Sequence, residues 1–162
     1  MKRDDRPLRL VAFDAADLEP ISAALQDAVA QLGDFEFSRR KKTFTVAFNR
    51  FLWEAGRRNR RVRCGLQIGQ VTAARSQNIR QGARDAVVNL LSIAFEPGED
   101  ASGTVVMVFS GGGEVRLDVE CLDMVMADLT APWRAAGRPA HETWPQETGP
   151  QETGPEEGAS KQ

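Results

Sequence analysis

Apolar and polar residues alternate along much of this chain, and a period of two residues predicts β-strands. The clearest case is residues 114–121, where Val115, Leu117, Val119 and Cys121 alternate with charged residues and are expected to face a core. Less regular runs predict further strands at residues 8–13, 62–68, 71–75, 86–95 and 104–109, and a hairpin at residues 34–49 with a polar turn at residues 38–42.

The alternation changes phase after Phe48. On the returning strand of the hairpin, Phe44, Val46 and Phe48 are at even-numbered positions, but Phe51 and Trp53 are at odd-numbered ones. This change predicts a β-bulge near Asn49 and Arg50, because a bulge inserts one extra residue into a strand.

Three consecutive glycines, at residues 111–113, lie between two predicted strands. They lack the Gly-Lys-Ser/Thr ending of a phosphate-binding P-loop, which also joins a strand to a helix. A hairpin turn that requires positive φ angles is therefore predicted instead.

An amphipathic helix is predicted near the N-terminus. Asp17 is placed as its N-cap, Pro20 falls in the first turn, and Gly33 lies where a C-terminal cap is expected. The apolar residues of this helix recur every three or four positions: Leu18, Ile21, Leu25, Ala28, Val29 and Leu32.

A second, short helix is predicted near the C-terminal end of the folded region. Leu122, Val125, Met126 and Leu129 are spaced as on one helical face, and the segment ends near Pro132.

These elements predict one α+β domain over residues 1–136, antiparallel and β-rich, with an N-terminal amphipathic helix and a short C-terminal helix. Their order is similar to that of the pleckstrin-homology-like (PH-like) superfold, a partly open barrel, and a two-layer α+β sheet is the alternative. Residues 137–162 repeat PQETG and are acidic and rich in proline and glycine, so we expect a disordered tail.

Charge is distributed unevenly, although the formal net charge is only −2. Between residues 39 and 84 there are thirteen basic residues and one acidic residue, Glu54, whereas both flanking regions are acidic. Arginine suits bidentate binding of carboxylate or phosphate groups. The residues predicted to bind an anionic partner are Arg39, Arg40, Lys41, Lys42, Arg57, Arg58, Arg60, Arg61 and Arg63, and Arg75, Arg80 and Arg84 follow in and around an irregular polar segment.

Three interpretations of this basic region remain open. The partner is an acidic protein or another anion, or it is RNA or DNA, for which Phe51 and Trp53 are the only nearby aromatic residues. Alternatively, the charges pair within the fold, with Glu114, Asp118 and Glu120 opposite Arg61 and Arg63 on neighbouring strands. The charge pattern alone does not choose between these interpretations.

Residues suited to catalysis are scarce. The chain has one histidine, His141 in the predicted tail, and no tyrosine, and no nucleophile–base pair can be assembled from the folded region. Cys64 and Cys121 occupy apolar positions in predicted strands, so we interpret both as buried, reduced residues. A non-enzymatic binding or adaptor module without cofactor or metal is therefore predicted, and a small enzyme that uses carboxylates and arginines is the alternative.

A short apolar run near the N-terminus, broken by Arg9, is too short for a signal peptide, and no segment reaches membrane-spanning length. We expect a cytoplasmic protein that does not bind membranes.

Several segments resemble an alphaproteobacterial family classed as a domain of unknown function, over roughly residues 8–130. The resemblance implies a bacterial, cytoplasmic, single-domain protein, and it implies no activity, cofactor or site residue. The segments are LRLVAFDAADLEPISAALQDAV (8–29), NRF and WE within 49–54, VTAARSQNI (71–79), FEPGE (95–99) and FSGGGEVRLDVECLD (109–123).

Overall fold

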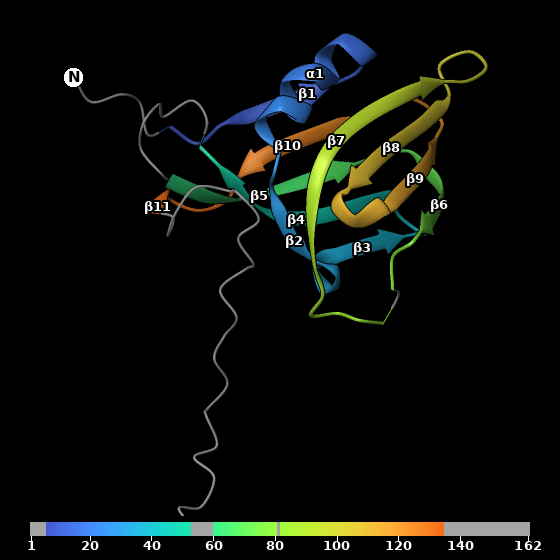
Figure 1. Ribbon diagram of the computed structural model, residues 1–162. Coiled ribbons are helices and arrows are strands. Elements are labelled where there is room, and N and C mark those ends of the chain that lie inside the picture. The colour runs from blue at the N-terminus through green and yellow to red at the C-terminus, as the bar shows by residue number, and fades with distance from the viewer. Residues whose placement is uncertain (1–5, 53–59, 81, 135–162) are drawn as a thin grey trace, which may run out of the picture.

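The alternating segments form one strongly bent antiparallel sheet in the computed structural model, which describes residues 6–52, 60–80 and 82–134 (Figure 1). One α-helix accompanies the sheet, and η1 and η3 are short 3-10 helices. The elements are β1 (Arg9–Ala12), α1 (Ala15–Ala24), β2 (Val29–Gln31), η1 (Leu32–Asp34), β3 (Phe35–Ser38), β4 (Thr43–Phe51), β5 (Arg60–Ile68), β6 (Val71–Gln77), β7 (Val87–Pro97), β8 (Gly103–Phe109), η3 (Ser110–Gly112), β9 (Glu114–Val119), β10 (Met124–Asp128) and β11 (Trp133–Arg134).

The strand order is β1-β10-β5-β4-β2-β7-β8-β9-β6, with β3 added beside β4 and β11 beside β5. The end strands β1 and β6 do not pair with each other, so the sheet is open. A β-rich, antiparallel α+β fold was predicted, and this is confirmed. The tail predicted to be disordered, at residues 137–162, lies outside the described residues.

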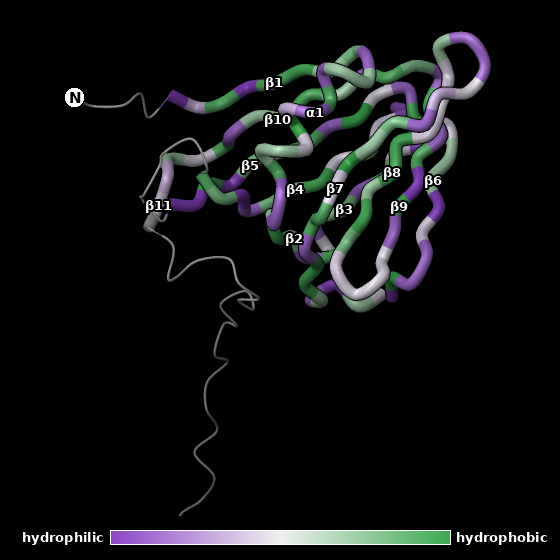
Figure 2. The backbone as a smooth tube through the Cα atoms, turned by 45° about the horizontal axis from the view of Figure 1, so that its top comes forward, coloured by the Kyte–Doolittle hydropathy of each residue, from purple (hydrophilic) through white to green (hydrophobic). Residues whose placement is uncertain are grey.

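Side chains from both halves of the bent sheet meet in one core. The predicted alternation holds on β9, where Val115, Leu117 and Val119 are buried. In Figure 2 the tube alternates between hydrophobic and hydrophilic colours along several strands, whereas β8, with core on one side and few polar residues, is mostly hydrophobic. Helix α1 packs against β1 and β7 and buries Leu18 and Ile21.

The start of α1 differs from the prediction by one turn. The Asp14 carboxylate accepts a hydrogen bond from the Asp17 backbone N–H at 2.8 Å, so Asp14 is the N-cap. The Asp17 carboxylate in turn accepts the Phe13 N–H at 3.1 Å. Pro20 consequently lies inside the helix rather than in its first turn.

The predicted continuation of this helix to Gly33 is wrong, because the segment after residue 24 joins the sheet. Asp27 has a φ of 61°, which turns the chain away from the helix. Val29 then pairs with Asn89 of β7, and β2 is buried between β4 and β7. Gly33 is not a helix cap, and its N–H donates to the carbonyl oxygen of Arg84 at 2.8 Å.

The predicted C-terminal helix is also wrong. Residues 124–128 form β10, which lies between β1 and β5. Leu122, Met124 and Met126 are buried at a period of two, while Leu129 is 62% exposed. The helix that would complete a PH-like barrel is therefore absent from the described residues.

The predicted bulge near Asn49 and Arg50 is not present. β4 keeps an unbroken register with β5 from Phe44 to Phe51. Arg50 occupies the next inward position after Phe48, and it is fully buried. The apparent change of phase arises because an arginine occupies a core position.

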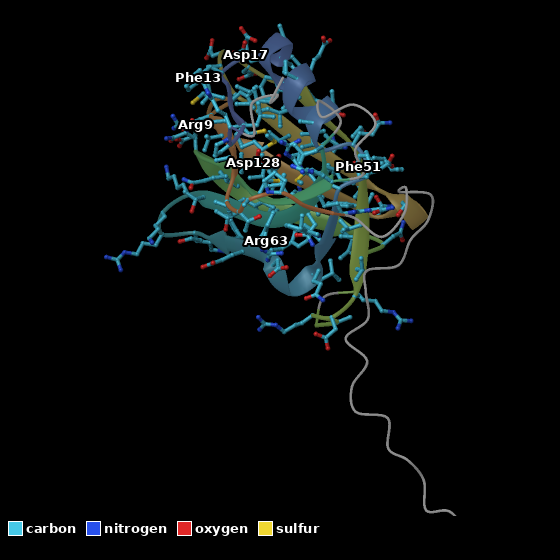
Figure 3. All side chains as sticks on the ribbon, turned by 90° about the vertical axis from the view of Figure 1, so that its left-hand side faces the viewer. Arg9, Phe13, Asp17, Phe51, Arg63 and Asp128 are labelled. Carbon is cyan, nitrogen blue, oxygen red and sulfur yellow. The ribbon has the colours of Figure 1, made fainter. Side chains whose placement is uncertain are left out.

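A buried carboxylate neutralises Arg50. The Nε and Nη2 atoms of Arg50 donate to the two carboxylate oxygens of Asp128 at 2.8 and 2.9 Å. This is the bidentate geometry of a strong charge-assisted pair. The Leu8 N–H also donates to Asp128, at 2.8 Å. Asp128 lies among the strands (Figure 3), and the pair connects β4 and β10 across β5.

The glycine-rich segment forms the predicted turn between β8 and β9. Gly111 and Gly112 have φ angles of 79° and 83°, which side chains with a Cβ atom rarely adopt. The Phe109 N–H donates to the Gly113 carbonyl at 2.8 Å and closes the turn.

We expect the variant D128A to lose about 3–5 kcal/mol of unfolding free energy, because it leaves a buried guanidinium without its counter-charge. Urea unfolding followed by circular dichroism measures this loss. The matched control is D118A, which removes the half-exposed pair with Arg75 and should lose at most about 1 kcal/mol. Equal losses in the two variants would show that the Arg50–Asp128 pair contributes no more than a surface contact.

Candidate functional site

The predicted basic surface is divided by the structure. Its first part, Arg39, Arg40, Lys41 and Lys42, forms the turn between β3 and β4, which we call the 39–42 turn. Its second part lies at the other end of β4, where Arg61 is opposite Phe51. The nine residues of β4 span roughly 25–30 Å, so the two parts do not form one patch. Of the remaining predicted residues, Arg57 and Arg58 lie outside the described residues, and Arg60 and Arg63 lie on β5.

Several of these residues make contacts within the fold. Arg63 donates to the Asp34 carboxylate and to the Asn49 side-chain oxygen, both at 3.3 Å. Lys42 pairs with Glu120 at 3.0 Å. The Arg61 guanidinium lies 5.9 Å from the ring centroid of Phe51.

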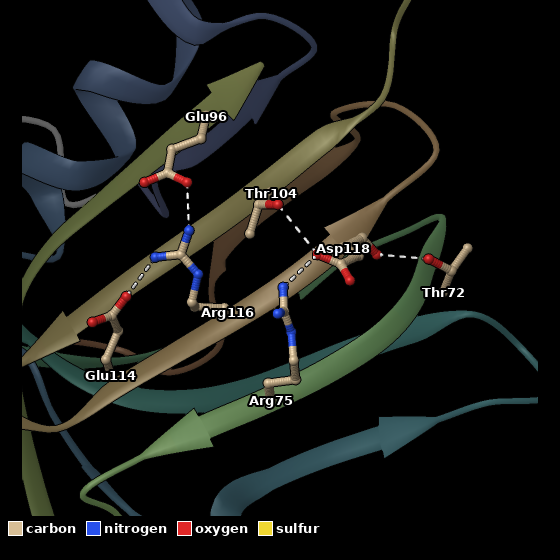
Figure 4. A network of polar contacts seen from close by, with 7 residues as sticks. All are labelled: Thr72, Arg75, Glu96, Thr104, Glu114, Arg116 and Asp118. Atoms are coloured by element: carbon tan, nitrogen blue, oxygen red, sulfur yellow. Dashed lines mark hydrogen bonds and ion pairs between the residues drawn. The ribbon is translucent and has the colours of Figure 1, made fainter. Parts of the chain in front are cut away.

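The predicted pairing of β9 carboxylates with Arg61 and Arg63 is wrong, because β9 lies between β8 and β6 and does not neighbour β5. The β9 residues form a network on the outer face of the sheet instead (Figure 4). Asp118 accepts hydrogen bonds from Arg75 at 2.9 Å and from Thr104 at 3.2 Å. Arg116 pairs with Glu114 and with Glu96 of β7, and the pKa of Arg116 is raised mainly by its hydrogen bond to Glu114 and further by Glu96.

The sheet has an opening between β3 and β6, which lie near each other without a strand pairing in the described chain (Figure 1). One end is closed where the Val71 N–H donates to the Lys42 carbonyl at 2.9 Å. The other end is closed by the hydrogen bonds from Leu32 to Ala86 and from Gly33 to Arg84. We call this opening the seam.

A cavity of about 280 Å³ occupies the seam. Phe44 and Val115 are buried at its base, and Phe35 is half-buried beside them. Phe35 packs against Phe44 and Phe109, with ring centroids 6.0 and 5.8 Å apart. The described residues that line the cavity are Leu32, Phe35, Phe44, Ala74, Arg75, Ser76, Ile79, Arg80, Gly82, Arg84 and Val115.

Three arginines border this apolar cavity, and they differ in their partners. Arg75 is paired with Asp118. Arg80 and Arg84 are exposed, and neither forms an ion pair with another described residue. The Arg84 side chain lies against Gly33, where an added Cβ atom would come within 3.5 Å of its Nε. Two uncompensated guanidinium groups therefore lie beside an apolar surface, which suits an anion with an apolar portion.

Sequence reasoning placed Arg75, Arg80 and Arg84 near an irregular segment and did not include them in the predicted site. The sequence feature that could have indicated this site is Ile79, because it is the only large apolar residue in the polar run from Gln77 to Arg84. In the structure Ile79 packs against the core and lines the cavity.

The described residues offer few other candidate functional sites. They contain no group of three histidine, cysteine, aspartate or glutamate residues that could hold a metal ion. A second cavity, of about 540 Å³, lies between α1 and β7, and its one charged lining residue among those described is Glu19. No described helix is long and apolar enough to cross a membrane.

The two cysteines differ in exposure. Cys64 is completely buried on β5, and burial raises the pKa of its thiol to about 12. Cys121 is half-buried, so the prediction that both are buried is only partly correct.

Comparison with known proteins identifies a family whose function is unknown. A family model described as "Protein of unknown function (DUF2948)" matches residues 8–141. No curated protein and no solved structure matches the chain.

We expect a thiol reagent at pH 8 to label Cys121 well before Cys64 in the native protein, because only thiolates react and the Cys64 thiol stays protonated and inaccessible. Peptide mass spectrometry after timed labelling distinguishes the two sites. Cys64 should react only after unfolding in urea. Equal native labelling rates would contradict the packing around β5.

Proposed function

Because the chain belongs to the DUF2948 family, described only as being of unknown function, we propose its role from the geometry: a non-enzymatic binding module that captures an anionic group of its partner at Arg80 and Arg84. The observation that carries this proposal is the position of these two arginines, exposed and without ion pairs among the described residues, at the border of the seam cavity. Arginine presents a planar fork of donors that matches a carboxylate.

The segment that carries these arginines is held in place by its backbone and by a side chain. The Gly33 N–H donates to the Arg84 carbonyl, and the Leu32 N–H donates to the Ala86 carbonyl, at 2.8 and 2.9 Å. The Asn78 side chain donates to the Gly112 carbonyl at 3.1 Å. A site attached at several points loses less conformational entropy on binding, and this supports a binding role.

The same cavity gives little support to an enzyme that combines carboxylates and arginines. Its described lining residues include three arginines and no carboxylate. Asp118, which pairs with the lining residue Arg75, also accepts a hydrogen bond from Thr104 on the outer face of the sheet. We therefore propose binding without a chemical step.

An acidic protein or small anion is favoured over RNA or DNA as the partner. Surfaces that bind single-stranded nucleic acids combine a basic groove with exposed aromatic rings on which the bases stack. Of the described rings beside Arg61, Trp133 is 39% exposed and Phe51 only 5% exposed, and Phe13, which is 65% exposed, lies beside Asp17 near α1 (Figure 3). One exposed ring at this end of β5 is not the row of rings on which successive bases stack. The outer face of β9 also carries several carboxylates, which interrupt the positive field.

We also propose that the module acts in the cytoplasm, in agreement with its two free cysteines, which suit a reducing compartment.

We expect the variant R80S/R84S to bind a fluorescein-labelled hexaglutamate peptide about tenfold more weakly than the wild type, since exposed charge pairs contribute up to about 1 kcal/mol each. Fluorescence anisotropy at low and high salt measures the affinity. The matched control R39S/R40S removes two exposed arginines of the 39–42 turn and should change the affinity by less than about twofold.

A labelled single-stranded oligonucleotide tests the alternative partner in the same assay. Tighter binding of the oligonucleotide, weakened by R39S/R40S as strongly as by R80S/R84S, would replace the proposal with a nucleic-acid surface. Unchanged peptide binding in R80S/R84S would refute capture at the seam.

A further inference from the structure

We infer that the seam cavity binds a small amphiphile, with its apolar body inside the cavity and its anionic head, a carboxylate or a phosphate, between Arg80 and Arg84. This inference rests on the proposed anion capture and adds the chemical class of the ligand. It combines two features of the seam: an apolar cavity, and two arginines that form no ion pair with another described residue.

The base of the cavity supplies an apolar surface that the described residues leave uncovered. Phe35 is half-buried although it packs against two aromatic rings, because no described strand pairs with β3 on the side of the seam. Ile79 and Leu32 are likewise half-buried on the cavity wall. An apolar ligand body that covers these side chains removes apolar area from water, which favours binding.

The size and closure of the seam favour a small ligand over an extended peptide. A volume of about 280 Å³ lies just below the usual range for small-molecule pockets, which is about 300–1,000 Å³. The contacts between Lys42 and Val71 and between Gly33 and Arg84 close the seam at both ends. These hydrogen bonds would block an extended peptide that ran along β6, whereas the short alkyl chain of a small ligand can enter from the side of the seam.

The charges place the head of the ligand at one position. Arg75 is neutralised by Asp118, so its guanidinium is directed to the outer face of the sheet (Figure 4). Arg80 and Arg84 remain as the cations beside the opening. An amphiphile with a cationic or neutral head lacks this interaction and should bind much more weakly.

Isothermal titration calorimetry of the full chain with octanoate and octyl phosphate tests the inference, and comparison of the two identifies the preferred head group. We expect saturable binding at one site for at least one of them. Octylammonium, which has the same chain and the opposite charge, and acetate, which lacks the chain, should each bind at least tenfold more weakly.

Two substitutions on β6 separate the cavity from the surface charge. A74F places a ring in the cavity and should weaken binding of the amphiphile at least tenfold. Q77F is the matched control, because Gln77 is opposite Glu114 on the outer face and does not line the cavity. Thermal melts and circular dichroism establish that both variants are folded. If A74F is unfolded, S76F replaces it, because Ser76 is exposed, lines the cavity and is opposite the inward-facing Val115.

The outcomes distinguish this inference from the proposed function. Binding that survives in A74F, or equal binding of octylammonium, would overturn the amphiphile site. If R80S/R84S weakens hexaglutamate binding but neither octanoate nor octyl phosphate binds the wild type, anion capture stands and the inference fails. If R80S/R84S changes neither affinity, both fail.

Discussion

The buried ion pair between Arg50 and Asp128 is the interaction on which the first half of the sheet depends. A guanidinium in the core requires a carboxylate within bonding distance, and Asp128 provides both of its oxygens. This requirement aligns residues 124–128 as a strand beside β5. It also anchors the chain before β1, because Leu8 donates to the same carboxylate. The pair therefore determines the position of β10 and, through it, of β1.

The arginines of the chain have several different roles in the folded structure. Arg50 is a core residue, Arg63 pairs with Asp34, and Arg75 joins the network of Asp118 on the outer face. A high density of arginine along the sequence consequently does not become one basic surface. The uncompensated charge that borders a cavity comes instead from Arg80 and Arg84, in a segment between two strands.

The proposed binding site follows from an incomplete sheet. Among the described strands, β3 pairs only with β4 and β6 pairs only with β9, so the space between them holds a cavity lined by side chains rather than another strand. Hydrogen bonds close this space at both ends and keep its shape. Because the base is aromatic and the border is cationic, the seam combines apolar burial with charge recognition in one small volume.

The alternation of apolar residues determined, without the structure, the β3–β4 hairpin, the strands β5 and β9 and the glycine turn, since their contacts are local or their period is unambiguous. Residues 122–129 fit both periods and residues 25–32 fit the helical one, and only pairing with distant strands decided that they form β10 and β2. The sequence alone could not predict the seam either, because Phe35, Arg84 and Val115 come together there only when the sheet bends. Local patterns determine the strands, whereas long-range pairing determines which edges stay open.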